Sequence, residues 1–289
     1  SGDEKIATVN EEGLITCVGA GTTLITAKTA DGGFTKEVEV IVREKPSVSE
    51  LHAPRIEADS SMKAKQKVTW DCVWFGRYPQ SEVASASPIY RALKNVDGWD
   101  DNNDITIGGN RYRRMKKGDA TYAAASSDKY YYNWSDADTY HYFKYEPVKW
   151  RVLKTDGNQA LLLSDVALDA QKYNAVRENV TWETSTIRSW LNGYGSSDNQ
   201  QGTDYSGRNF IGSAFTSDEQ SAIADTPVVN ADNKSYGTEG GNDTVDKIFL
   251  LSESEVYGRS AEPYGFVPDW NRYDEARRSK SSTYAKAMG

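Results

Sequence analysis

The sequence predicts an α+β fold in which a short all-β segment precedes a larger mixed domain. Residues 1–43 consist of short β-type runs separated by glycine-containing turns. From Val68 onward, β-type runs are followed by segments that carry helix-capping signals. The chain has 289 residues, of which 38% are hydrophobic and 11% aromatic, so it can bury more than one core.

Charge and hydropathy exclude several classes of partner. The chain has 34 basic and 42 acidic residues, a net charge of -8, and its basic residues are largely scattered. We therefore expect no nucleic-acid partner, because phosphate binding depends on a concentrated positive face. No apolar run approaches the roughly 18 residues that cross a bilayer, so no direct membrane insertion is expected in this segment. The sequence does not open with a signal peptide, although an export signal could lie upstream.

The first segment predicts four strands. Their sequences are "KIATVN", "GLITCV", "TTLITAKT" and "KEVEVIV". In the last run, Val38, Val40 and Val42 alternate with charged residues, which predicts one buried face and one solvated face.

The stretch "IATVNEEGLITCVGAGTTLITAKTADGGFTKEVEVIV" resembles the second half of a group 2 bacterial immunoglobulin-like domain. The resemblance implies that residues 1–43 are part of an all-β sandwich whose first strands are missing, with apolar strand edges left unpaired. Residues 44–66 contain two prolines and many charges, which predicts a linker. We expect its histidine, His52, to be a solvated loop residue.

Five strands are predicted in the larger domain, residues 67–289. Their sequences are "VTWDCVWFGRYP", "ITIGGNRYRRMK", "YHYFKY", "VKWRVLKT" and "QALLLSD". The last two are expected to form a hairpin over the turn at residues 156–158, "DGN".

Helices are predicted at residues 184–192 and 217–224. The second begins with Thr216 and Glu219 at the spacing of a capping box. The run "DKIFLLSESEVYG" predicts a strand that leads into a helix with a second capping box, and "SSTYAKAMG" predicts a final short helix.

The larger domain also resembles a known domain family. The motifs "VWFGRYPQ", "PVKWRVLKTDGNQALLLSDVALDAQKYN", "TWETSTIRSWLNG", "FTSDEQSAI", "GGNDTVDKIFLLSESEV" and "DEARRSKSSTYAKAMG" occur in the order typical of an uncharacterised domain family of Gram-positive gut bacterial surface proteins. That family is related to the C-type-lectin-like fold, which formylglycine-generating enzymes share. The resemblance implies a C-type-lectin-like domain over residues 67–289 that lacks its C-terminal strands, in a secreted or wall-attached protein.

Two sequence patterns are candidate metal sites. Asp100, Asn102 and Asp104 alternate as in a calcium loop, but Ile105 and Arg111 stand where that pattern needs Gly and Glu. A polar turn is therefore the favoured interpretation. The calcium-binding triplets of the lectin fold are also broken, because the chain has "EPV" at 146–148 and "WNR" at 270–272. We predict no metal ligand and no cofactor.

No residue type points clearly to catalysis. Cys17 and Cys72 are expected to be buried structural residues, since free cysteine is among the most buried types. Formylglycine-generating chemistry needs a cysteine pair, and Cys17 belongs to the other segment. His141, the only histidine of the predicted larger domain, shares strand parity with Phe143 and Tyr145, which favours a packed neighbour over a general base. Carboxylate pairs suited to glycoside hydrolysis remain open, because sequence does not give their separation.

The segment 130–142 is the candidate ligand site. Its rings are interspersed with Asn, Ser and Asp and keep no single period. Tyr and Trp combine a large rigid surface with a polar group, which suits recognition of sugars or proteins. We predict an exposed aromatic platform of Tyr131, Trp134, Tyr140 and Tyr142. The alternative is that these rings cover the domain's own sheet.

The function predicted is non-catalytic extracellular binding or adhesion, with a glycan or protein on a cell surface as the ligand. The chain would then be extracellular or attached to the cell wall. A secreted enzyme that acts on glycans or peptidoglycan is the alternative, and a purely structural surface module is the third interpretation.

Overall fold

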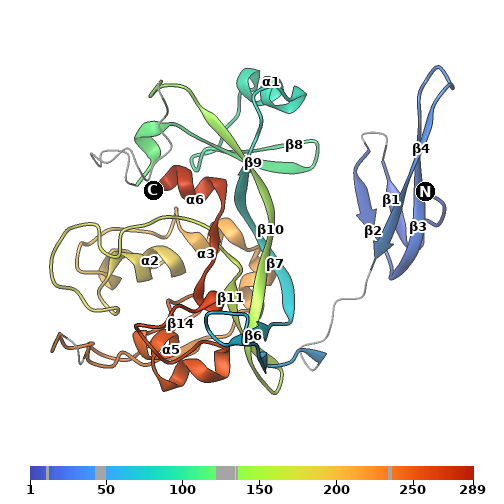
Figure 1. Ribbon diagram of the computed structural model, residues 1–289. Coiled ribbons are helices and arrows are strands. Elements are labelled where there is room, and N and C mark those ends of the chain that lie inside the picture. The colour runs from blue at the N-terminus through green and yellow to red at the C-terminus, as the bar shows by residue number, and fades with distance from the viewer. Residues whose placement is uncertain (11–12, 43–49, 122–133, 135, 234–235) are drawn as a thin grey trace. The chain divides into compact units, whose positions relative to one another are not determined.

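The computed structural model describes the chain except residues 11–12, 43–49, 122–133, 135 and 234–235 (Figure 1). Its internal contacts define two compact units. The first comprises residues 1–50 and 106–110, and the second comprises residues 51–105 and 111–289. The second unit combines helices and sheets, as the α+β prediction requires.

The first unit contains four strands at the predicted positions. β1 (Ala7–Val9) pairs antiparallel with β2 (Ile15–Cys17), and β3 (Gly21–Lys28) pairs antiparallel with β4 (Thr35–Val42). The β3–β4 turn contains Gly32, whose φ of 74° lies in the left-handed region that favours glycine.

Two predictions about burial are wrong. Val38 is exposed, and Val40 and Val42 are only half-buried, so β4 has no fully buried face. Cys17 is exposed and Cys72 is half-buried, so neither thiol lies in a fully buried core position. The buried residues of the unit, among those described, are Ala7, Thr23 and Ile25, and this small core leaves the valine face uncovered.

The second unit is organised around one long central strand, β10 (His141–Asp156). β7 (Cys72–Glu82) pairs along one edge of β10. On the other edge, β9 (Asn110–Met115) pairs with the first residues of β10 and β11 (Gln159–Ser164) pairs with the last. β8 (Asp104–Ile107) extends the sheet beyond β9. The predicted hairpin over residues 156–158 is confirmed, because Asp156 is directly opposite Gln159.

Three pairs of short strands surround this sheet. β5 (Arg55–Ala58) pairs with β6 (Gln66–Thr69), β13 (Thr226–Val228) pairs with β14 (Thr244–Asp246), and β12 (Val166–Ala167) pairs in parallel with β15 (Lys280–Ser281). β5 lies inside the stretch predicted as a linker, so the second unit begins earlier than expected.

The helices begin at polar caps. They are α1 (Pro88–Asn95), α2 (Thr186–Asn192), α3 (Phe210–Ala214), α4 (Ser217–Ala222), α5 (Glu253–Tyr257) and α6 (Thr283–Met288). The capping boxes predicted from Thr216 with Glu219 and from Ser252 with Glu255 are both present. The strand predicted before α5 is instead β14, and residues 247–251 are irregular.

Short 3-10 helices occupy Lys117–Asp119, Ser196–Asp198, Arg259–Tyr264 (η4) and Glu275–Arg277 (η5). None of the helices in the described part of the chain has the length and apolar character that crossing a bilayer requires.

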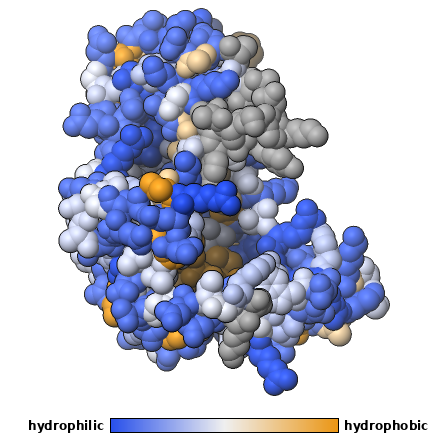
Figure 2. Space-filling view, turned by 90° about the vertical axis from the view of Figure 1, so that its left-hand side faces the viewer, coloured by the Kyte–Doolittle hydropathy of each residue, from blue (hydrophilic) through white to orange (hydrophobic). Residues whose placement is uncertain are grey.

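Helices α2, α3 and α6 lie on one side of the β7–β10 sheet (Figure 1). The main core fills the space between them. Its buried members include Phe143 and Trp150 from β10, Ile187 from α2, Phe210 from α3 and Tyr284 from α6. A second, smaller core forms where Leu153 packs with Ala261, Phe266 and Ala276 of the η4–η5 region. One face of the second unit is largely hydrophilic and shows only scattered apolar residues around a central hollow (Figure 2).

A buried carboxylate ties the sheet together. Asp104 accepts hydrogen bonds from Arg113 Nε and Nη2 at 2.8 Å each, from Arg111 Nη2 at 2.6 Å and from Tyr145 Oη at 2.8 Å. Asp100 forms the predicted polar turn, because its Oδ1 accepts the amides of Asn102 at 2.9 Å and Asp104 at 2.8 Å. The alternating acidic residues of this loop therefore serve a turn and an ion-pair network.

We expect Asp104→Ala to lower the free energy of unfolding by about 3 to 5 kcal/mol, because it leaves Arg113 buried without its partner. Asp138→Ala is the control, since it removes an exposed carboxylate 3.9 Å from Lys116 Nζ. The control should change the free energy of unfolding by less than about 1 kcal/mol. Urea melts of both variants measure the difference, and equal losses would contradict this role for Asp104.

Candidate ligand-binding site

The structure places the sequence-predicted site residues in different environments. Trp134 is 9% exposed and Tyr142 is 4% exposed, while Tyr140 is half-buried beside Arg114, whose guanidinium lies 4.5 Å from the ring centroid. Tyr131 lies outside the described residues. The exposure predicted for Trp134 and Tyr142 is therefore wrong, and a role of these four residues in ligand binding stays a prediction.

Packing explains the burial of Tyr142. Its ring meets Tyr90 of α1 edge-on at 5.2 Å and stacks with Trp99 at 5.7 Å. These partners come from the segment between β7 and β8, which nothing near Tyr142 in the sequence reveals. Burial also raises the pKa of Tyr142 above its usual value.

His141 is held between an aromatic ring and a carboxylate. Its ring stacks on Trp134 with centroids 3.8 Å apart, and its Nδ1 lies 2.7 Å from Glu82 Oε1. This half-buried position agrees with the packed neighbour predicted from strand parity. His52 also belongs to the second unit and is exposed as expected, but it is not isolated, because its Nδ1 lies 2.9 Å from Asp71 Oδ2.

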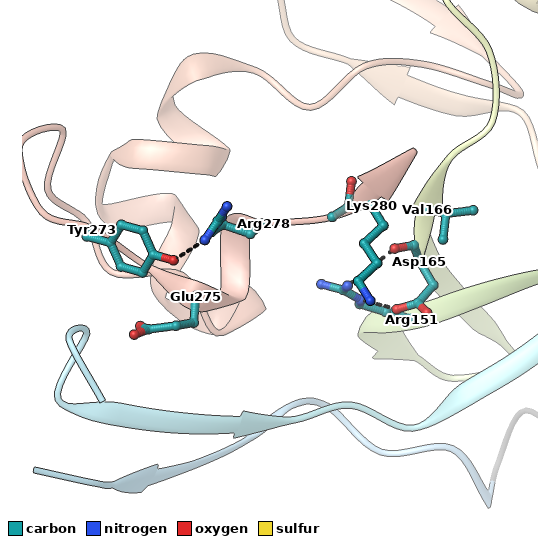
Figure 3. Close-up of a pocket in the computed structure, with 8 residues that line it drawn as sticks. Arg151, Asp165, Val166, Tyr273, Glu275, Arg278 and Lys280 are labelled. Atoms are coloured by element: carbon teal, nitrogen blue, oxygen red, sulfur yellow. Dashed lines mark hydrogen bonds and ion pairs between the residues drawn. The ribbon is translucent and has the colours of Figure 1, made fainter. Parts of the chain in front are cut away.

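A pocket of about 590 Å³ lies at the other end of the sheet (Figure 3). We call it the basic pocket, because basic side chains outnumber acidic ones in its wall. Tyr273, Glu275 and Arg278 form one side, and Arg151, Asp165 and Lys280 form the other (Figure 3). The lining residues are Arg151, Asp165, Val166, Tyr273, Glu275, Arg278, Ser279 and Lys280.

The wall around η5 is anchored to the rest of the unit by hydrogen bonds. Arg151 Nη1 donates to the carbonyl of Ala276 at 3.1 Å, which ties η5 to β10. Arg277 donates to the carbonyl of Arg272 at 2.6 Å and thereby stabilises the preceding loop. β15 pairs with β12, which positions Lys280 directly opposite Val166.

Both carboxylates of the pocket already have partners. Asp165 Oδ1 accepts from Arg151 Nε at 2.6 Å, and its Oδ2 lies 3.4 Å from Lys149 Nζ. Glu275 accepts the backbone amides of Lys63 at 2.9 Å and Ala64 at 3.1 Å. Desolvation opposes ionisation of both acids. The Arg151 hydrogen bond nevertheless holds the pKa of Asp165 below its usual value, and hydrogen bonds from backbone amides lower the pKa of Glu275.

One exposed aromatic ring lines the pocket, and two further exposed rings lie on the elements that carry or adjoin its wall. Tyr273 lines it directly and is exposed. Trp74 is 63% exposed and lies opposite Lys149 in the β7–β10 register, so both side chains project from the same face of the sheet as Arg151. In the loop before Tyr273, Trp270 is 56% exposed and stacks at 4.0 Å on Tyr257.

Sequence reasoning missed this pocket. A signal was present in "DWNRYDEARRSK", residues 269–280, which combines two aromatic residues with a local concentration of basic residues. The opposite wall includes Asp165, which is more than 100 residues earlier in the sequence, and only the fold brings it there.

Among the residues that the structure describes, no group of three or more His, Cys, Asp or Glu side chains is arranged to hold a metal ion. The basic pocket provides charged groups, hydrogen-bond donors and one aromatic ring, that of Tyr273.

Tyr142→Ala is expected to lower the free energy of unfolding by about 3 to 5 kcal/mol, because it removes a buried ring that packs against Tyr90 and Trp99. Tyr236→Ala is the matched control, since Tyr236 is 83% exposed. The control should stay within about 0.5 kcal/mol of the unmodified protein. Denaturant melts separate the two variants, and a neutral Tyr142→Ala would restore the exposed-platform interpretation.

Asp165 generates a prediction about pH. Its folded-state pKa is lowered, so ionised Asp165 favours folding. This contribution is complete above the unfolded-state pKa of about 3.9 and is lost as pH falls through the lower folded-state value. Unfolding free energies should therefore be higher for the unmodified protein than for Asp165→Asn at pH 7, with the gap closing below about pH 4. The same gap at pH 7 and at pH 2 would contradict the assignment.

Comparison with known proteins gives a family match over part of the chain. Residues 157–287 match the model of a family described as "Domain of unknown function (DUF6273)". No curated protein and no solved structure matches the chain. With the exception of Arg151, every residue that lines the basic pocket lies in the region that matches this family.

Proposed function

We propose that the chain is a non-catalytic binding module of an extracellular or wall-attached bacterial protein, with a glycan as its ligand. The observation that carries this proposal is the basic pocket, which combines the exposed ring of Tyr273 with charged hydrogen-bonding groups. Trp and Tyr faces pack against the apolar faces of sugar rings, while polar groups at the edge fix orientation.

The architecture supports the same role. The first unit, with its two antiparallel hairpins, is consistent with an immunoglobulin-like spacer. The second unit is proposed to have a C-type-lectin-like fold, a scaffold whose ligand sites are carried by loops. Tyr273 is in such a loop, and loops positioned by a rigid sheet often carry binding residues.

The carboxylates of the pocket favour binding over hydrolysis. Asp165 and Glu275 lie on opposite sides of the pocket (Figure 3). Glycosidases also place two carboxyl groups on either side of the bond that they cleave. Hydrolysis needs one carboxyl group with a raised pKa to act as the general acid. Both pKa values are lowered instead, and both carboxylates are engaged by hydrogen bonds.

Replacing Tyr273 by Ala should weaken glycan binding by about 1 to 3 kcal/mol, the range of an aromatic hot spot. The melting temperature should stay nearly constant, because the ring is exposed. Tyr236→Ala is again the control, since it removes an equally exposed tyrosine outside the pocket.

The experiment is a glycan array and a protein array, each probed with the whole chain and with both variants. Glycan binding that Tyr273→Ala reduces and Tyr236→Ala retains supports the proposal. Binding to proteins alone would overturn the choice of a glycan. New reducing ends after incubation with a bound glycan would favour the enzyme.

A further inference from the structure

We propose that the basic pocket selects acidic glycans, and that Arg278 and Lys280 bind carboxylate or sulfate groups on the sugar from opposite sides of the pocket. This inference rests on the proposed glycan-binding function and names the class of glycan. It begins from the charges in the pocket wall, where three basic side chains face two acidic ones.

The acidic side chains do not neutralise Arg278 and Lys280. Asp165 is shared between Arg151 Nε at 2.6 Å and Lys149 Nζ at 3.4 Å, so two cations already surround this one carboxylate. Glu275 is occupied by two backbone amides of the β5–β6 hairpin. Arg278 donates a hydrogen bond to the hydroxyl of Tyr273, a neutral group, and its guanidinium lies 5.3 Å from the centroid of that ring.

Arg278 and Lys280 face the pocket from opposite sides (Figure 3). Arg278 lies with Tyr273, and Lys280 lies with Arg151 and Asp165. Both residues are exposed, so a glycan that enters the pocket can meet a guanidinium on one side and an ammonium on the other.

The surroundings add to this selectivity. Lys63 Nζ lies over the Tyr273 ring, 4.6 Å from its centroid, which places another cation next to the pocket. The chain as a whole carries a net charge of -8, so the basic pocket is a local exception. A glycan with acidic substituents would place their charges on Arg278 and Lys280 while a sugar ring packs on the exposed part of Tyr273. A neutral glycan keeps only the ring contact.

Two pairs of probes test the proposal with the whole chain. One pair is tetragalacturonate and its methyl ester, which share one sugar skeleton and differ in charge. The other is a galactose tetrasaccharide with and without 6-O-sulfate groups. Calorimetry at low salt should show at least tenfold tighter binding of one acidic probe than of its neutral partner. The pair that responds distinguishes carboxylate from sulfate as the recognised group.

Lys280→Ala should weaken the affinity for the preferred acidic probe about tenfold and leave the affinity for its neutral partner unchanged. Lys94→Ala, which removes an exposed lysine of α1 outside the pocket, should have little effect. Raising the salt concentration should reduce the difference between acidic and neutral probes, because exposed charge interactions are screened.

Equal affinity for acidic and neutral probes would contradict the proposed selectivity for acidic glycans but would not contradict the proposed glycan binding. Acidic-probe binding that Lys280→Ala and Lys94→Ala weaken equally would overturn the assignment to this pocket. If none of the four probes binds while another glycan binds on the array, the acidic class is wrong and the proposed function survives. If no glycan binds in either experiment, both proposals fall.

Discussion

The second unit depends on the buried carboxylate of Asp104. A desolvated carboxylate is costly unless its lone pairs are satisfied, and here donors from β9 and β10 satisfy them. Arg113 and Arg111 also donate to Ser213 of α3, at 3.4 Å from Arg113 and 3.3 Å from Arg111. One acidic side chain thus fixes the positions of three strands and a helix, and removing it would leave several buried polar groups without their partner.

Asp246 repeats this arrangement on the helical side of the unit. Its carboxylate is fully buried and accepts hydrogen bonds from Trp182 Nε1 at 2.9 Å, Arg188 Nε at 2.8 Å and Tyr194 Oη at 3.0 Å. These donors join α2 and its flanking loops to β14. Within the described part of the chain, no buried side-chain nitrogen or oxygen lacks a hydrogen-bond partner. The aromatic core is therefore arranged around satisfied polar centres.

Local signals in the sequence predicted local structure. The capping boxes of α4 and α5 and the hairpin over residues 156–158 depend on residues within four positions of one another, and they appear as predicted. The valine face of β4 and the environment of Tyr142 depend on which distant segments cover them. Alternation predicted a buried face at β4 that the small core of the first unit does not supply. Polar neighbours predicted exposure at Tyr142, although α1 and Trp99 enclose it. The basic pocket lay beyond sequence reasoning for the same reason, since β12 and β15 are joined only in the fold.

The basic pocket exists only while β12 and β15 remain paired. Only two residue pairs, Val166 with Lys280 and Ala167 with Ser281, join these strands. Transient release of β15 would carry Arg278 and Lys280 away from Asp165 and dissolve the pocket. A ligand that binds only the assembled wall must therefore stabilise the docked form of β15, to an extent that rises with its concentration and affinity. Occupancy of the pocket and hydrogen-exchange protection of β15 then report the same equilibrium.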